Sequence, residues 1–220
     1  MPTLKKQNRK SLVGFILVNV VLFSLLSNNF IIDITGIKDL ISNPLDPRIL
    51  SVILLFGLSI ILEGILSSNL KAIIVFNRIK DPLPGCRVFT EIAPQDNRIN
   101  MQKLTERYDN KLPSEPASQN TEWFRLYKLY EKVEVVEESH KSFLLTRDLL
   151  ALSIILLILS TILHIAVGSS VLNIIYSTLI YAVFIIVFKI SAQNYGNRFT
   201  ANVIVEYLNS PNKNREIKND

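Results

Sequence analysis

Apolar residues are gathered in four long runs along this chain of 220 residues, and the runs come in two pairs. The first pair covers residues 11–27 and 49–66, and its only charged side chain is Glu63. The second pair covers residues 149–167 and 171–188, which contain no Asp, Glu, Lys or Arg. Because about 17–25 mainly apolar residues form a helix that can cross a membrane, the pattern predicts four transmembrane helices in two hairpins.

A polar segment separates the two hairpins and is expected to form a mainly helical head outside the membrane. The chain then divides into an N-terminal arm with the first hairpin (1–66), the head (67–148), the second hairpin (149–188) and a cytosolic amphipathic helix with a polar tail (189–220). The expected fold class is an all-α integral membrane protein with the head inserted between the second and third spans.

Three of the four predicted spans continue as helices beyond the membrane. The second span keeps one apolar face through Lys80, until a proline-rich loop stops it. A helix with an apolar stripe from Trp123 onward runs on through the whole third span. The fourth span continues as an amphipathic helix to Leu208 and ends at Ser210-Pro211.

Smaller elements follow from local signals. Pro47 suits the first turn of the second span, where its missing amide costs nothing. Residues 87–92 are compatible with a short strand, and residues 99–108 predict a short helix. Ser114 or Ser118 is the expected cap of the helix that contains Trp123.

The basic residues favour one orientation of the spans. Of the 24 Lys and Arg residues, only Lys38 and Arg48 fall in the two loops that lie opposite the termini. The positive-inside rule therefore predicts that both termini and the head are cytoplasmic, in an inner-membrane protein of bacterial type. The basic arm before the first span also fits a signal peptide, but no small-residue cleavage site follows, and we expect an uncleaved anchor.

Composition and motifs exclude several classes of activity. Acidic and basic residues are nearly balanced in the head, so no direct nucleic-acid partner is expected. Cys86 is the only cysteine, which rules out a disulfide or a thiolate metal cluster within the chain. Phosphate-binding, dinucleotide-binding and zinc-protease motifs are missing from the sequence. We therefore predict no catalytic residue, no metal site and no cofactor.

Glu63 is the first candidate for a functional residue within the spans. An ionisable group inside a membrane helix usually faces a partner or water, because burial in hydrocarbon is costly. Arg147 and Lys189 lie at matching depth and are the expected charge partners. Glu63 then has two interpretations, a structural ion pair or part of an ion path, and Ser59 continues its polar stripe one turn away.

Three further polar residues lie inside the predicted spans. Asn19 falls at the centre of the first span and is expected to hydrogen-bond to another helix. His164 and Asn173 stand near the outer end of the second hairpin, on opposite arms, where a hydrogen bond between them would lock the hairpin. They are too few to form a metal site.

Polar and aromatic residues of the central segment are the candidates for ligand binding. They lie in its loops and at its helix starts, where they either bind a small ligand or pack the head. These residues are Arg98, Asn120, Trp123, Tyr127 and Asp148.

The leading functional hypothesis is a non-enzymatic multi-pass membrane protein, working as a homo-oligomer in the lipid bilayer. Its head senses a cytosolic ligand or protein partner, and the long helices pass the signal to the bundle. The architecture also resembles small bacterial effectors that perturb a membrane in antiviral defence, which is an analogy of build only. The alternatives are a transporter or membrane-enzyme subunit that uses Glu63, and a membrane anchor for a larger complex.

Overall fold

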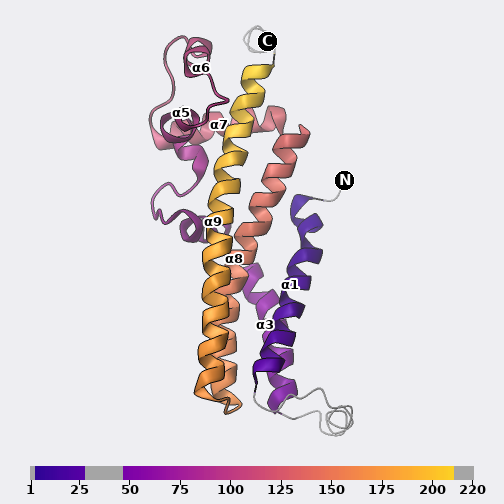
Figure 1. Ribbon diagram of the computed structural model, residues 1–220. Helices are drawn as coiled ribbons and strands as arrows, with labels where there is room; N and C mark the ends of the chain where they lie inside the picture. The colour runs from indigo at the N-terminus through magenta and orange to yellow at the C-terminus, as the bar shows by residue number, and fades with distance from the viewer. Residues whose placement is uncertain (1–2, 28–46, 211–220) are drawn as a thin grey trace. The chain divides into compact units, whose positions relative to one another are not determined.

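The computed structural model describes residues 3–27 and 47–210, and every regular element in these ranges is helical (Figure 1). The chain forms two compact units. The bundle unit comprises residues 1–71 and 144–191, and the head unit comprises residues 72–143 and 192–220. The polar tail predicted after Ser210 lies outside the described residues.

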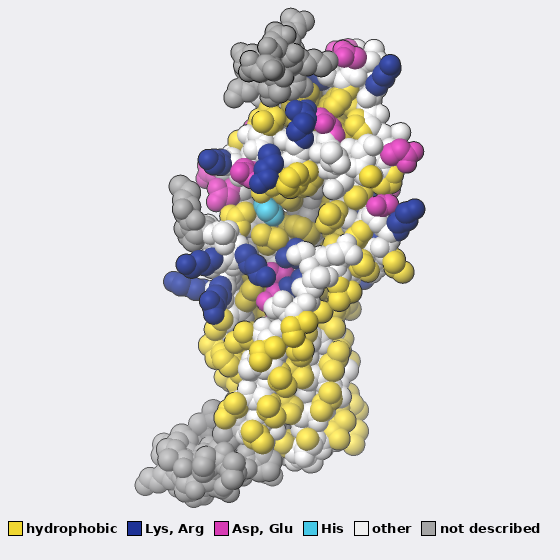
Figure 2. Space-filling model, turned by 180° about the vertical axis from the view of Figure 1, so that it is seen from behind, with side chains coloured by type: hydrophobic (Ala, Val, Ile, Leu, Met, Phe, Trp, Pro, Cys, Tyr) yellow, Lys and Arg dark blue, Asp and Glu magenta, His cyan; other side chains and the backbone are white. Residues whose placement is uncertain are grey.

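The bundle unit contains the long apolar helices. These are α1 (Leu4–Leu26), α3 (Pro47–Ile65) and the membrane-type parts of α8 (Glu134–Ala166) and α9 (Val171–Asn209). By length and composition, α1, α8 and α9 can each cross a membrane, and α3 makes a fourth span if it is counted together with the helix that follows. Hydrophobic side chains predominate on the face of these helices that Figure 2 shows. The all-helical fold of the described residues is confirmed, with three candidate spans, or four if the bent pair is counted as one.

Apolar side chains from all four helices fill the interior of the bundle. One cluster joins Phe23 of α1 and Leu55 of α3 with Leu156 and Leu163 of α8 and Tyr181 of α9. A second cluster joins α1 to α8 and is built on Leu12, Ile16 and Leu152. Since each helix contributes to a shared core, the four helices are held as one bundle.

The second predicted span does not continue straight to Lys80. Helix α3 ends at Ile65, and α4 (Ser68–Phe76) leaves it at an angle of 93°. The Ser67 hydroxyl accepts a hydrogen bond from the Leu70 amide at 3.2 Å, so Ser67 caps a new helix at the break. Helix α4 then stops before Asn77, which has a φ of 53°.

Short helical turns occupy the segment for which the sequence predicts a possible short strand. A 3₁₀ turn, η1 (Pro84–Arg87), runs into a π turn, η2 (Val88–Ile92), and then into α5 (Ala93–Gln95). The Phe89 amide donates to the Gln119 side-chain oxygen at 2.9 Å instead of to a neighbouring strand. The strand prediction is wrong, because the backbone of this segment finds a hydrogen-bond partner in a helix that packs against it.

The short helix predicted over residues 99–108 is present as α6 (Met101–Arg107). The next helix, α7 (Pro116–Tyr130), has Glu115 at its N-cap and Pro116 at its first position, so neither Ser114 nor Ser118 caps it. Helix α7 ends at Tyr130 and α8 begins at Glu134, so the predicted single helix from Trp123 through the third span is interrupted.

The predicted continuation of the fourth apolar run as a long helix is confirmed. Helix α9 runs without interruption to Asn209. The part of α9 that belongs to the head unit, which we call its head half, buries the apolar stripe predicted from the sequence. This stripe consists of Phe199, Val203, Ile204, Tyr207 and Leu208. Two cations of α6 satisfy carbonyl oxygens at its C-terminal end: Arg107 donates to Ser210 at 2.9 Å and Lys103 donates to Leu208 at 3.0 Å.

Replacing Gly196 with leucine is expected to destabilise the head unit by roughly 1–3 kcal/mol. A Cβ atom at this position of α9 would lie 2.8 Å from the Phe76 ring and 3.0 Å from the Phe143 ring, and both rings are buried. Circular dichroism of the purified protein should show a lower melting temperature. The matched control is Gly57→Leu, because a Cβ atom at Gly57 has no neighbour within 4 Å. Equal melting temperatures for the two variants would contradict this packing.

Candidate functional site

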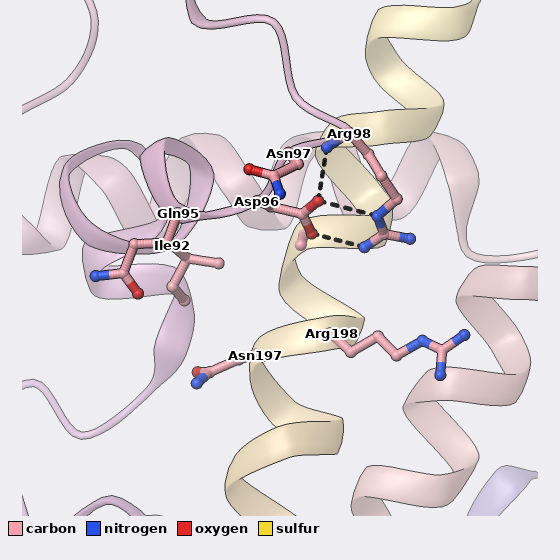
Figure 3. A pocket seen from close by; sticks show the side chains of 8 residues that line it. Ile92, Gln95, Asp96, Asn97, Arg98, Asn197 and Arg198 are labelled. Carbon is pink, nitrogen blue, oxygen red and sulfur yellow. Dashed lines mark hydrogen bonds and ion pairs between the residues drawn. The ribbon is translucent and has the colours of Figure 1, made fainter.

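A pocket in the head unit lies between α9 and the segment that follows η2. Its volume is about 570 Å³, and Figure 3 shows its lining side chains. The lining is mostly polar and comprises Ile92, Gln95, Asp96, Asn97, Arg98, Asn197, Arg198 and Ala201. The size falls within the usual range for small-molecule sites, about 300–1,000 Å³.

An ion pair forms one side of the pocket. Arg98 donates two hydrogen bonds to the Asp96 carboxylate, at 2.9 and 2.7 Å (Figure 3). These bonds lower the pKa of Asp96 and raise the pKa of Arg98. Both groups therefore stay charged near neutral pH, and together they add no net charge to the pocket.

The same arginine joins the pocket to two long helices. Arg98 Nη1 donates to the Asn202 side-chain oxygen of α9 at 2.9 Å. The Asn202 amide in turn donates to the Val135 carbonyl oxygen at 3.2 Å and to the Ser139 hydroxyl at 3.1 Å, both on α8. Asn202 is buried, so this chain of hydrogen bonds is shielded from water.

The carboxamides of the pocket are available for a ligand. Among the described residues, the side chains of Gln95, Asn97 and Asn197 form no hydrogen bond. In Figure 3 Asn197 points from α9 toward Ile92 and Gln95, whereas Arg198 extends to the other side of the helix. A carboxamide offers both donors and an acceptor, so the arrangement suits a polar ligand.

Helix α7 fastens the pocket segment to α9. A methyl group on Gly85 would lie 2.5 Å from Asn120 Oδ1 and 2.9 Å from Trp123 Cε3, so only glycine permits this approach. The Trp123 indole donates to the Thr200 carbonyl oxygen at 3.2 Å. Tyr127 stacks on Trp123 with ring centroids 5.7 Å apart. Asn120, Trp123 and Tyr127 therefore pack the head unit beside the pocket and do not line it.

A second polar cluster lies in the bundle unit and consists of four charged side chains. Lys71 of α4 forms an ion pair with Glu63 of α3 and donates to Asp148 of α8 at 3.1 Å. Arg147 also donates to the Asp148 carboxylate, at 3.1 Å. The side chains of Lys71, Glu63 and Asp148 are only 2%, 14% and 2% exposed. We call Glu63, Lys71, Arg147 and Asp148 the charge network.

The charge network corrects three expectations. The partner of Glu63 is Lys71, whereas Arg147 pairs with Asp148. Lys189 is half-buried on α9 and interacts with other described residues. Asp148 belongs to the bundle unit and its ion pairs, not to the packing of the head.

Of the other polar residues in the candidate spans, Asn19, Ser59 and His164 are buried and Asn173 is half-buried. Asn19 donates to the Phe15 carbonyl oxygen within its own helix at 2.7 Å, and Ser59 donates likewise to Leu55. The His164 ring nitrogen Nδ1 lies 2.9 Å from the Ser169 hydroxyl in the hairpin turn. His164 therefore bonds to Ser169 in the hairpin turn and not to Asn173. The backbone amide of Asn173 donates a hydrogen bond to the Ser170 hydroxyl at 3.3 Å.

Sequence reasoning missed three residues that organise these sites. Lys71 lies in α4, beyond a helix break that the apolar pattern does not predict. Gln119 is buried and bonds to Phe89 and to the Ser114 carbonyl oxygen, and Asn202 is buried within an apolar stripe. For Asn202 the available signal is a carboxamide between the apolar neighbours Ala201 and Val203, because such a group needs partners when buried.

No protein-family model, curated protein or solved structure matches this chain.

Proposed function

We propose that this chain is a non-enzymatic membrane protein whose head unit binds a small polar ligand and passes that event to the bundle. One observation carries the proposal. Helix α9 is a single helix of 39 residues that lines the pocket with Asn197 and Ala201 and also supplies a candidate span. An α-helix is stiff along its axis, so a shift at one end moves the other end.

The proposed layout has four spans with the termini and the head in the cytoplasm. In this layout α3 and the bent helix α4 together form the second span, which length and composition alone leave undecided. The support is the uneven distribution of Lys and Arg between the two sides of the spans. In this layout a cytosolic metabolite reaches the pocket directly.

The chemistry of the pocket defines the proposed ligand. Asn97, Asn197 and Gln95 offer paired donors and acceptors, and Asp96 with Arg98 adds a neutral ion pair. This set suits a small polar molecule with several hydrogen-bonding groups, and Arg198, which also lines the pocket, favours a ligand that carries a negative group. Ile92 and Ala201 provide an apolar wall for part of it.

The proposed signal passes through Arg98. A ligand that competes for its guanidinium weakens the bond to Asn202, which is the residue that ties α9 to α8. Loss of that tie lets α9 move relative to the start of α8. Displacements of helices in switching proteins are typically about 1–2 Å.

Filling the pocket by mutation tests this coupling without a known ligand. We expect Asn197→Trp to change the distance between spin labels at Leu17 of α1 and Leu179 of α9 by about 1–2 Å. Both label sites are exposed on the apolar surface of the bundle unit, and Cys86→Ser provides a background without other thiols. Double electron–electron resonance on the protein in nanodiscs gives the distance.

Asn194→Trp is the matched control, because Asn194 is exposed on the same helix and does not line the pocket. The proposal requires a change in the first variant alone. Unchanged distances in both variants, or the same change in both, would overturn the coupling between pocket and bundle.

A transporter is the second candidate, and the charge network favours it. Glu63 is an ionisable group in a candidate span, beside two further buried charges. A transporter that works through this carboxylate loses substrate flux in Glu63→Gln, whereas a sensor retains the response to Asn197→Trp in that variant. The association of copies that we propose for either function is tested by the mass of the detergent-solubilised protein.

A further inference from the structure

Three buried polar atoms inside the bundle unit have no hydrogen-bond partner among the described residues. They are Asn19 Oδ1 on α1, His164 Nε2 on α8 and Tyr181 Oη on α9, although the Ser160 hydroxyl lies near enough to Tyr181 to interact with it. The three side chains are at most 1% exposed, so neither lipid nor a second copy of the chain can reach them. Leaving such atoms without a partner in an apolar interior is costly, and native proteins commonly satisfy them with internal water.

These three residues lie around one core cluster, and we call this set of residues the column. The Phe23 and His164 rings are 4.4 Å apart, and Asn19 lies one turn from Phe23 on the same face of α1. Phe23 and Tyr181 belong to the same core cluster. The three residues therefore border the same core cluster.

Two buried serines connect the members of the column. Ser160 of α8 and Ser177 of α9 bring their hydroxyl oxygens to 3.5 Å from each other. Ser160 lies one turn from His164, and Ser177 lies one turn from Tyr181, in each case on the same helix face. The interior thus carries polar groups over successive turns, from the hairpin end with His164 toward Tyr181.

We propose that this column holds a chain of internal water molecules and conducts protons along the bundle. Hydroxyl, imidazole and carboxamide groups can each hold a water molecule by donating or accepting. Protons move along such a chain by exchange of hydrogen bonds, so a proton that enters at one end releases another at the far end. Larger cations do not pass, because the apolar side chains of the cluster around Phe23 and Leu156 fill the remaining space. The path is a property of the bundle and does not depend on a ligand in the head.

Proton flux into vesicles tests the path directly. The full chain is reconstituted into vesicles of phosphatidylethanolamine and phosphatidylglycerol that contain a pH-sensitive dye, and a potassium gradient with valinomycin drives protons inward. We expect the wild-type vesicles to acidify faster than vesicles without protein. Tyr181→Phe should slow the protein-dependent flux about tenfold, because one hydrogen-bonding site of the chain is lost.

Tyr176→Phe is the matched control, since this tyrosine lies on the same helix and is 53% exposed, whereas Tyr181 is 1% exposed. Its flux should equal that of the wild type. The proposal is overturned if protein-containing vesicles are no leakier than empty ones, if both tyrosine variants behave alike, or if sodium ions pass as readily as protons.

Thermal stability provides an independent readout of hydration. If water satisfies the Tyr181 hydroxyl, Tyr181→Phe removes hydrogen bonds and lowers the melting temperature relative to Tyr176→Phe. If the hydroxyl has no partner, its removal relieves a burial cost and raises the melting temperature. The second result would overturn the internal water chain whatever the flux.

Discussion

Replacing Lys71 with methionine is expected to destabilise the bundle unit by about 3–5 kcal/mol. Lys71 is the only cation that contacts both carboxylates of the charge network among the described residues, pairing with Glu63 and with Asp148. Methionine keeps the length of the side chain but removes the charge. Glu63 then loses its lysine partner, and Asp148 keeps only Arg147.

The size of the effect follows from burial. An ion pair at a protein surface contributes little, about 0–1 kcal/mol, because water screens it and replaces it readily. The carboxylate left without a partner is Glu63, whose side chain is only 14% exposed, so little water can reach it. The cost is therefore the burial of an uncompensated charge, which exceeds the contribution of the original pair.

Chemical denaturation in detergent micelles, followed by circular dichroism, measures this loss. Lys80→Met is the control, because Lys80 is exposed and forms no ion pair among the described residues. Adding Glu63→Gln to Lys71→Met should recover part of the stability, since one unmatched carboxylate disappears. A cost for Lys71→Met no larger than that for Lys80→Met would show that the network is hydrated and structurally unimportant.

Glu63→Gln alone should cost less than Lys71→Met. Lys71 keeps its ion pair with Asp148 at 3.1 Å in that variant, so no buried charge loses every partner, although Lys71 and Arg147 then share one carboxylate. The variant therefore separates the two interpretations of Glu63. A structural carboxylate yields a modest loss of stability with unchanged flux, and a working carboxylate yields a loss of flux in a folded protein.

The charge network also shows what the sequence could not predict. Glu63 and Lys71 are eight residues apart, which is about 12 Å along a straight helix. Only the 93° break between α3 and α4 brings them together. The apolar pattern continues across the break, so periodicity favoured a straight helix, although three cap-forming residues in succession, Ser67, Ser68 and Asn69, were a signal for a new helix start.

The apolar runs themselves were sufficient to predict the long apolar helices and the continuation of the last one to Asn209. Each run exceeds the length of an ordinary core helix, and few other structures accommodate such runs. The missed turn at residues 88–92 had a readable signal as well. Val88, Phe89 and Ile92 are the buried residues, and this spacing fits a helix, whereas a strand would bury alternate positions.

The pocket could be predicted only in part. Arg98 was a candidate from its place in a polar loop, but its partner Asn202 lies 104 residues later in the chain. Asn197 lies on the polar face of a helix recognised for its apolar stripe. Pairings at such separation depend on how helices pack, which local pattern does not contain.

Replacing Trp123 with alanine is the second large effect, with an expected loss of about 3–5 kcal/mol in the head unit. The ring stacks on Tyr127 and meets the Phe199 ring edge-on, with centroids 5.3 Å apart. Its indole N–H also satisfies the Thr200 carbonyl oxygen at 3.2 Å. Alanine removes all of these contacts and leaves a cavity beside Gly85, a residue that has no side chain to fill it.

Phe124→Ala is the matched control, because Phe124 is the next aromatic residue on α7 and is 51% exposed. Hydrogen–deuterium exchange measured by mass spectrometry reports the two units separately, and it does not need the tryptophan as a probe. In Trp123→Ala we expect faster exchange in the peptides of α7, η1 and the head half of α9. Peptides from α1 and the span half of α8 should keep the exchange rates of the wild type.

The same experiment tests how α7 supports the proposed pocket. Trp123 does not line the pocket, yet it fastens α9 through Thr200, which is next to the lining residue Ala201. If this fastening positions the pocket wall, faster exchange in Trp123→Ala extends to the peptide that contains Asn197 and Ala201. If exchange rises in α7 and η1 while that peptide stays protected, the buried stripe of α9 and the bonds of Asn202 hold the wall without Trp123, and the tryptophan serves only the packing of α7.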